Sequence, residues 1–355
     1  MLATTELFKL VENTKANEAL CGNLLPLNNN PSILDVEGLN SLTVVEDDPA
    51  GAIPVAFGLF NMCTPSQGYC SVVSASNRYD NVFVNLESAK VKAQQLGVSE
   101  EFADQHAVFK VKSVLNELPN LGSFPQYYRA FGEPAGRPLH QCVVDELIRR
   151  TVGEKNYDMK RNVTVDLYDL NANMPEHSDE LWCDFSGFVV GDKHRFADEK
   201  LTSILNDFTN EQTELTFQPL GPKNSSTFFD YDQTLSVMDR QTFLEYLFGI
   251  QGVAGRIALD AEEQPVGYVI SLHDRILQCY ADTPSIAHRL IVEHLRSINQ
   301  PTVKFFAAAH NDELFEKLSK AAKTVRRVRR FHSRIVPSNI KWSQIFMFNI
   351  GVNLF

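Results

Sequence analysis

The stretch from Ile257 to Asn311 constrains the fold of this chain more than any other part of the sequence. It begins with two apolar runs rich in β-branched residues, separated by an acidic turn that starts at Asp260, and this pattern predicts a β-hairpin. A further run at Ile276–Ala281 predicts a third strand, and apolar residues at helical spacing from Ile286 predict a helix. The remaining run, up to Asn311, predicts a strand. The expected order is hairpin, strand, helix, strand.

An earlier part of the chain repeats this order. A second hairpin with an acidic turn is expected first, then a helix with one apolar face, then a strand in which apolar side chains alternate with polar ones. The segments are Ser41–Glu46 and Ile53–Phe60 for the hairpin, Arg137–Val152 for the helix and Asn162–Leu167 for the strand. The sequence does not show which segment supplies the strand before the earlier helix.

Two copies of one core predict two domains, which a chain of 355 residues is long enough to hold. We expect an N-terminal domain over 1–195, a linker over 196–213 and a C-terminal domain over 214–355. The hairpin and the helix lie much further apart in the first copy than in the second, so an insertion is expected near 76–130. Partly helical segments are expected at 82–95 and 101–116 in this insertion, and helices are expected at Thr5–Ala19 and at 196–210.

Charge and composition restrict the kinds of partner. The net charge of −11 argues against a protein that binds nucleic acid through phosphate contacts. No run reaches the roughly 18–20 apolar residues of a membrane span, and the first residues do not have the pattern of a secretory signal. The six cysteines lack metal-ligand spacing. We therefore expect reduced thiols, no metal, no membrane association and a cytoplasmic location; the oligomeric state stays open.

The sequence resembles the GNAT superfamily of acyl-CoA-dependent N-acyltransferases, in the two-copy type found in bacteria and nematodes. The likeness is best over about 228–350 and rests mainly on element order over 41–190. The residues that carry it are Tyr231-Asp232, Asp239-Arg240, the strand Pro265-Val-Gly-Tyr, Tyr280-Ala-Asp282 ahead of Ile286-Ala-His-Arg-Leu, Asn311 and the late Lys341-Trp-Ser-Gln-Ile-Phe. The resemblance implies an α+β fold of two GNAT-like domains, each a mixed, mostly antiparallel sheet flanked by helices.

The resemblance also implies a chemistry. In this family an amine attacks the thioester of acetyl-CoA or another acyl-CoA directly, without a covalent enzyme intermediate, so the protein aligns two substrates and manages a proton. Backbone amides at the start of the helix after the fourth strand hold the pyrophosphate, because a helix N-terminus offers unpaired donors and positive potential. The expected co-substrate is an acyl-CoA, and the expected partner is a small-molecule amine that the sequence does not name.

In the first copy, the family's phosphate loop (Arg or Gln, two residues, Gly, one residue, Gly or Ala) finds a partial match at Arg129-Ala-Phe-Gly132-Glu-Pro134-Ala-Gly136-Arg137. Pro134 stands where Gly or Ala is expected and lacks an N–H donor. The segment is therefore either a shifted phosphate loop or a Gly/Pro turn that enters a helix. Candidate cofactor-binding residues are Arg129, Gly132, Gly136, Arg137 and Asn171.

In the second copy, the corresponding segment Ala281–Ser285 has no glycine. Asp282 would repel a pyrophosphate there, and the same segment suits the cap of the helix that follows. If this copy binds a ligand, a cationic amine is favoured, and the candidate substrate-binding residues are Tyr280, Asp282 and Asn311.

Family members often have a tyrosine on the helix after the Asn as general acid, and neither copy has one, so the catalytic residues are unassigned. Two hypotheses stay open: an N-acetyltransferase-like enzyme, and a catalytically inactive GNAT-fold module that binds a small molecule or a protein. Glu133 and Asp166 have no stronger claim to be a base than any other carboxylate. The basic run Arg326–Arg330 is interpreted as a solvated strand with acidic neighbours, although it could bind phosphate or nucleic acid.

Overall fold

The structure is a computed structural model of residues 1–355. It describes residues 39–48, 51–79, 82–88, 107–115, 136–153, 161–168, 182–183, 188–207, 214–308, 316, 320 and 322–348. The expected helix at Thr5–Ala19 lies outside these ranges. In the described part of the chain, no helix has both the length and the apolar character needed to cross a membrane.

The N-terminal half is a set of strands covered by one helix. The hairpin of β1 and β2 is continued by β3, which is the missing fourth strand of the first copy and runs parallel to β7. A parallel connection of this kind needs a crossover, and α6 supplies it. The elements are β1 Leu39–Asp48, β2 Gly51–Thr64, β3 Gln67–Ala75, the 3-10 turn Asn77–Tyr79, β4 Phe83–Ser88, β5 Ala107–Leu115, β6 Arg137–Pro138, α6 Leu139–Thr151 and β7 Asn162–Tyr168.

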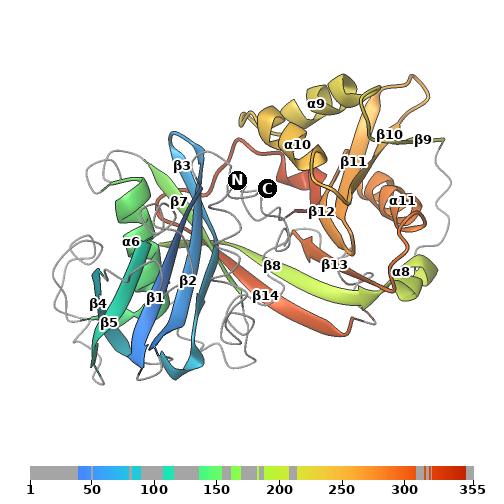
Figure 1. Ribbon diagram of the computed structural model, residues 1–355. Helices are drawn as coiled ribbons and strands as arrows, with labels where there is room; N and C mark the ends of the chain where they lie inside the picture. Colours follow the sequence, from blue (N-terminus) through green and yellow to red (C-terminus); the bar gives the residue numbers. More distant parts are fainter. Residues whose placement is uncertain are drawn as a thin grey trace.

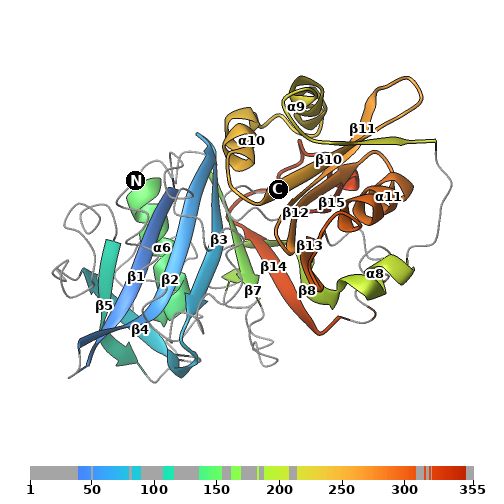
Figure 2. The ribbon, with the colours of Figure 1, turned by 45° about the vertical axis from the view of Figure 1, so that its right-hand side comes forward.

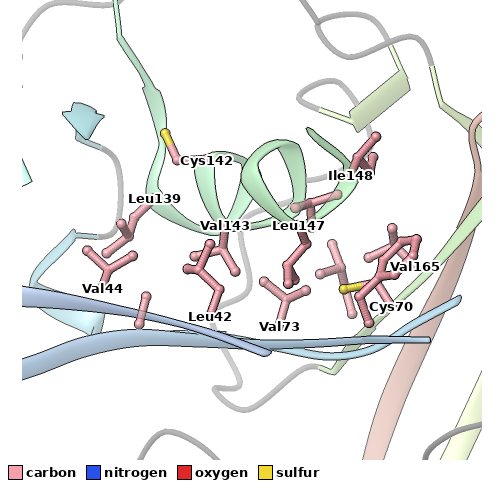
Figure 3. Close-up of a cluster of buried hydrophobic side chains, with 14 of the residues drawn as sticks. Leu42, Val44, Cys70, Val73, Leu139, Cys142, Val143, Leu147, Ile148 and Val165 are labelled. Atoms are coloured by element: carbon pink, nitrogen blue, oxygen red, sulfur yellow. The ribbon is translucent and has the colours of Figure 1, made fainter. Parts of the chain in front are cut away.

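The apolar stripe of α6 explains why this helix lies on the sheet. Val143 and Leu147 are fully buried and point at Leu42 and Val73 of the strands below (Figure 3). Each such side chain contributes about 1.5–3 kcal/mol when it leaves water. On the opposite side of the helix Arg149 and Arg150 are exposed, which gives the amphipathic pattern that the sequence predicted.

The C-terminal half has the same core with helices on both faces of its sheet. Two helices, α9 and α10, pack on one face, and α11 packs on the other (Figures 1 and 2). The elements are β9 Thr216–Pro219, α9 Ser225–Gln233, α10 Gln241–Phe248, β10 Val253–Leu259, β11 Pro265–Leu272, β12 Arg275–Ala281, α11 Pro284–Leu295, β13 Thr302–Ala307, the 3-10 turn Trp342–Gln344 and β15 Ile345–Met347.

Two local features fix the geometry of this half. Asp260 closes the β10–β11 hairpin, because its Oδ1 accepts the backbone N–H groups of Glu262 (3.0 Å) and Gln264 (2.8 Å). This explains the acidic turn as an Asx turn. Gly267 lets α11 approach the sheet closely, since a Cβ there would come within 2.7 Å of the Tyr280 carbonyl and 2.8 Å of the Leu290 side chain.

The two halves join in one continuous sheet through two strands, β8 Val189–Lys200 and β14 Thr324–His332. The strand order is β6-β4-β5-β1-β2-β3-β7-β14-β8-β13-β15-β12-β11-β10-β9. In the chain β8 follows β7, but it pairs with β13 of the other half, and β14 follows β13, but it pairs with β7. Each half therefore receives the next strand of the other half. Figures 1 and 2 show β8 and β14 side by side where the halves meet.

The α+β class with two similar cores is confirmed. The helix predictions for 82–95 and 101–116 are wrong over the residues that the structure describes, and the prediction for 196–210 is only partly right. Residues 83–88 and 107–115 are strands β4 and β5, which pair with each other beside β1. Residues 196–200 belong to β8, and the helix α8 begins only at Leu201 and ends at Asp207. The polar sequence of β8 does not alternate like a half-buried strand, and it is extended because β14 and β13 pair with both of its edges. The domain boundaries at 195 and 214 stay predictions.

Candidate functional site

The fold directs attention to the place in each copy where two parallel strands stop pairing. In the N-terminal copy, the ladder between β3 and β7 ends at Cys70 and Val165, although the strands continue to Ala75 and Tyr168. We call this place the N-terminal divergence. Within the described part of the chain, no strand enters between β3 and β7.

The crossover helix α6 starts without a side-chain cap. Gly136 has a φ of 53°, a left-handed conformation that favours glycine, and it turns the chain into α6. Pro138 is the N-cap residue and makes no side-chain hydrogen bond to the first turn. Arg137 is buried and forms an ion pair with Asp145 of the same helix. Burial raises the pKa of Asp145 to about 6, against the opposing effect of Arg137.

A buried polar cluster lies at the N-terminal divergence. Asp166 of β7 accepts a hydrogen bond from the Tyr69 hydroxyl of β3 (2.6 Å) and two from Arg330 of β14, from Nε and from one terminal nitrogen, both 2.7 Å long. Asp166, Tyr69 and Arg330 are all 0 % exposed. Since Asp166 and Arg330 face each other across β7 and β14, the two halves share one buried ion pair.

A second network continues along the same strands. Asn162 donates to Gln67 (2.8 Å), Gln67 donates to the Thr164 hydroxyl (3.0 Å), and that hydroxyl lies 2.9 Å from Nδ1 of His332. Burial, together with the nearby Arg330, lowers the pKa of His332 to about 4.

The C-terminal divergence lies between β12 and β13 and has a different structure. These strands share a single parallel pair, Arg275 with Lys304. Beyond that pair, the short strand β15 bonds to both of them, to β12 through Cys279 and to β13 through Ala307. The three residues of β15 are buried. A strand of the chain itself therefore fills the space between the two parallel strands.

The helix beside the C-terminal divergence is capped. The Thr283 side chain accepts the Ile286 N–H (3.3 Å), and Pro284 at the first turn has no N–H to offer. Asp282 is exposed, and its Oδ1 accepts hydrogen bonds from the Tyr231 hydroxyl (2.9 Å) and the Gln344 amide (3.1 Å). A carboxylate and a capped first turn both disfavour an anion at this helix start.

The centre of the C-terminal copy contains a buried arginine side chain. Arg240, at the start of α10, forms an ion pair with Asp232 and donates to the hydroxyls of Tyr268 and Tyr280, each at 3.2 Å. Gln278 donates to the Tyr280 hydroxyl as well (3.3 Å). Burial raises the pKa of Tyr280 to about 12. Arg240 of the Asp-Arg pair and Asp232 of the Tyr-Asp pair are thus parts of one internal cluster, whereas Asp239 is exposed.

The structure places four of the eight candidate residues. Gly136 and Arg137 lie at the start of α6, and Tyr280 and Asp282 lie at the end of β12. Tyr280 is fully buried and Asp282 is exposed, so the side chains of these two do not face a common space. Arg129, Gly132, Asn171 and Asn311 lie outside the described residues, as does Glu133. The ligand-binding roles of all eight stay predictions.

Sequence reasoning missed the buried clusters. The alternation Val163, Val165, Leu167 puts Asp166 on the other face of β7, where a carboxylate needs a partner. Arg330 of β14 is fully buried and therefore not solvated, which corrects the interpretation of the basic run, although its partner Asp166 is acidic as expected. A charged residue in an apolar strand was the available signal, but its partner is 164 residues away.

Each half has the same strand and helix order, β2-β3-α6-β7 and β11-β12-α11-β13, which is the order that the GNAT resemblance implied. The chain thus contains two copies of one α+β core, with exchanged strands between them. A tandem GNAT protein from the clavulanic acid biosynthesis pathway is 9 % identical, with 95 % of this chain and 96 % of that chain covered and a TM-score of 0.47.

Other solved structures give similar values. A putative acetyltransferase from Pyrococcus horikoshii is 11 % identical over 84 % of this chain and 76 % of that one, with a TM-score of 0.44. A protein of unknown function from Enterococcus faecalis V583, described as a probable N-acyltransferase, is 8 % identical over 96 % and 70 %, with a TM-score of 0.43. A family profile described as a domain of unknown function (DUF7596) matches residues 26–190. No curated protein matches the chain.

Proposed function

We propose that the chain is an acyl-CoA-dependent N-acyltransferase in which only the N-terminal copy holds the acyl-CoA. The observation that carries this proposal is the contrast between the two divergences. At the C-terminal one, β15 lies between the strands and Thr283 caps the helix. At the N-terminal one, no described strand lies between β3 and β7, and no side chain caps α6.

The start of α6 would hold the pyrophosphate of acyl-CoA through its backbone N–H groups. The amine nitrogen would attack the thioester carbonyl carbon, forming the N–C bond while the C–S bond breaks. The amine loses a proton, and the thiolate of CoA leaves and takes one up. No residue is assigned as acid or base, and alignment of the two substrates is the contribution that the fold supports.

Thermal unfolding with CoA, acetyl-CoA and longer acyl-CoAs tests the binding half of this proposal. Millimolar ligand should raise the midpoint by a few degrees, because a ligand that binds only the folded state stabilises it. His140→Asp should remove the shift, because it places a carboxylate in the first turn of α6, where phosphates would approach. The matched change in the other copy, Asp282→Asn, should leave the shift unchanged.

A transfer assay tests the catalytic half. Acetyl-CoA and a panel of polyamines and amino acids should release free CoA thiol in an amount equal to the acetylated amine. Stabilisation by CoA without transfer to any amine would retain the binding site and reject the enzyme. Absence of CoA stabilisation would reject the proposal as a whole.

The second candidate is a catalytically inactive GNAT-fold module that binds a small molecule or a protein. The filled C-terminal divergence favours it, because β15 and Arg240 occupy the centre of that copy with the chain's own groups. Acetyl transfer in the assay above would exclude it. The five cysteines of the described residues are free thiols, which fits a cytoplasmic location as part of the first proposal, and cell fractionation tests that part.

A further inference from the structure

The exchanged strands connect the two copies far more closely than a linker does. β14 pairs with β7 from Val328 to His332, and β8 pairs with β13 from Lys200 to Arg195. β14 and β8 also pair with each other along most of their length. Neither copy can keep its full set of strands if the other unfolds, because each borrowed strand belongs to the other half of the chain.

Side chains on both faces of the borrowed strand reinforce this connection. On one face, Arg330 from the C-terminal half neutralises Asp166 of the N-terminal half, and both are 0 % exposed. On the other face, Phe331 stacks on Trp182, with 5.6 Å between the ring centroids, and is buried within the core of the N-terminal copy. A buried charge left without its partner is strongly destabilising, so loss of β14 would leave Asp166 in an apolar surrounding.

The apolar cores are also shared. Tyr69 of β3 and Val328 of β14 belong to the same buried cluster as Leu244, Leu277 and Phe348 of the C-terminal copy. The Arg330 guanidinium lies 4.8 Å from the ring centre of Phe348, next to the end of β15. One continuous set of buried contacts therefore runs from the N-terminal divergence to the C-terminal one.

We propose that each copy is the obligate partner of the other, and that the two unfold as a single cooperative unit. The C-terminal copy then has a role that does not depend on any ligand of its own: it supplies β14 and Arg330, which complete the sheet and the polar cluster at the N-terminal divergence. This inference does not rest on the proposed enzymatic function, since it concerns only the folded chain.

The chain contains a natural pair of probes for this proposal. Its two tryptophans lie in different copies, Trp182 in the N-terminal core and Trp342 beside Phe348 in the C-terminal core. The variants Trp182→Phe and Trp342→Phe of the full chain each leave one fluorophore, so each reports on one copy. Under the proposal, urea unfolding followed by either probe gives one and the same midpoint.

Core variants in each copy provide the decisive comparison. Leu147 of α6 packs only in the N-terminal core, and Leu290 of α11 packs only in the C-terminal core. Leu147→Ala should lower the midpoint reported by Trp342 as much as that reported by Trp182, and Leu290→Ala should do the same in reverse. Arg296→Ala, at an exposed ion pair, is the matched surface control and should move neither midpoint.

The opposite result is equally clear. If each core variant shifts only the probe of its own copy, or if the two probes of the parent chain give separate transitions, the copies unfold independently and the proposal is wrong. The test does not depend on the core variants folding. The two single-tryptophan variants, Trp182→Phe and Trp342→Phe, already show whether the two midpoints coincide.

Discussion

The two copies differ in structure at the place where their two parallel strands stop pairing. Both have two parallel strands that part, at Cys70 and Val165 in one copy and after Arg275 and Lys304 in the other. The C-terminal copy inserts β15 at this place and caps the helix beside it with Thr283. The N-terminal copy does neither in its described residues, and it instead builds the Tyr69–Asp166–Arg330 cluster with a strand taken from its neighbour.

The sequence likeness to the GNAT superfamily is strongest in the C-terminal copy, whereas the proposed acyl-CoA site lies in the N-terminal copy. In the C-terminal copy, several of the residues that carry the GNAT resemblance contact one another: Asp232, Arg240, Tyr268 and Tyr280 form one internal cluster. Motifs retained for packing identify a fold without preserving an activity.

Arg330→Met should give the largest effect on the comparison. It leaves Asp166 buried without its cation, and we expect a loss of about 3–5 kcal/mol in the free energy of unfolding. The double variant Arg330→Met/Asp166→Leu should recover most of that loss, because two apolar groups replace both charges. Urea titration measures each value. Equal losses in the single and double variants would mean that the ion pair itself is not what the sheet requires.

Acid should destabilise the chain through buried neutral histidines. Burial lowers the pKa of His294 to about 4, below its ordinary value of 6.5. Between these values the unfolded chain binds a proton that the folded chain does not, so stability falls as pH drops from about 6.5 to about 4. This contribution is about 2 kcal/mol between pH 7 and pH 5.

The change His294→Gln tests this origin of the acid sensitivity. Glutamine can still bond to the Ser271 hydroxyl, which lies 2.7 Å from Nε2 of His294 in the parent chain. The variant should therefore lose less stability than the parent between pH 7 and pH 5. An unchanged pH dependence would mean that His332, His140 or another group causes the loss of stability at low pH.

Thr283→Ala should give the smallest effect. Removal of an N-cap hydroxyl costs about 1 kcal/mol, and the loss should appear in urea titration. The corresponding residue of the other copy, Pro138, makes no side-chain cap, so Pro138→Ala should not cause a cap-related loss. A matching loss in both variants would remove the distinction between the two helix starts.

Local patterns predicted the cores well because the relevant forces are local. The alternation in Asn162–Tyr168 and the helical stripe of Leu139–Thr151 fix which face of each element is buried. The strand β3 was missed, although Tyr69, Cys70 and Val73 are buried, because its apolar run has no helix or turn signal that assigns it to the first copy.

The remaining features depend on contacts that no local pattern contains. β8 has a polar sequence and is a strand only because β14 and β13 pair with its two edges. The partner of Asp166 is 164 residues away, and Met347 of β15 pairs with Ala307 and Cys279, 40 and 68 residues earlier in the chain. The sequence therefore predicted where the candidate site of each copy lies, between a strand and a helix. It did not predict that β15 would lie between the strands of the C-terminal copy.

The origin of β14 has a consequence for the order of events during synthesis. A ribosome releases the N-terminal strands long before residues 324–332, yet one of the two neighbours of β7 lies in that late segment. The N-terminal half therefore cannot complete its sheet before β14 has been translated. The two halves thus do not fold one after the other during synthesis. Arg330, the ion-pair partner of Asp166, is translated 164 residues after it. Contacts of such sequence separation form slowly, so the nascent first half is the stage most exposed to misassembly.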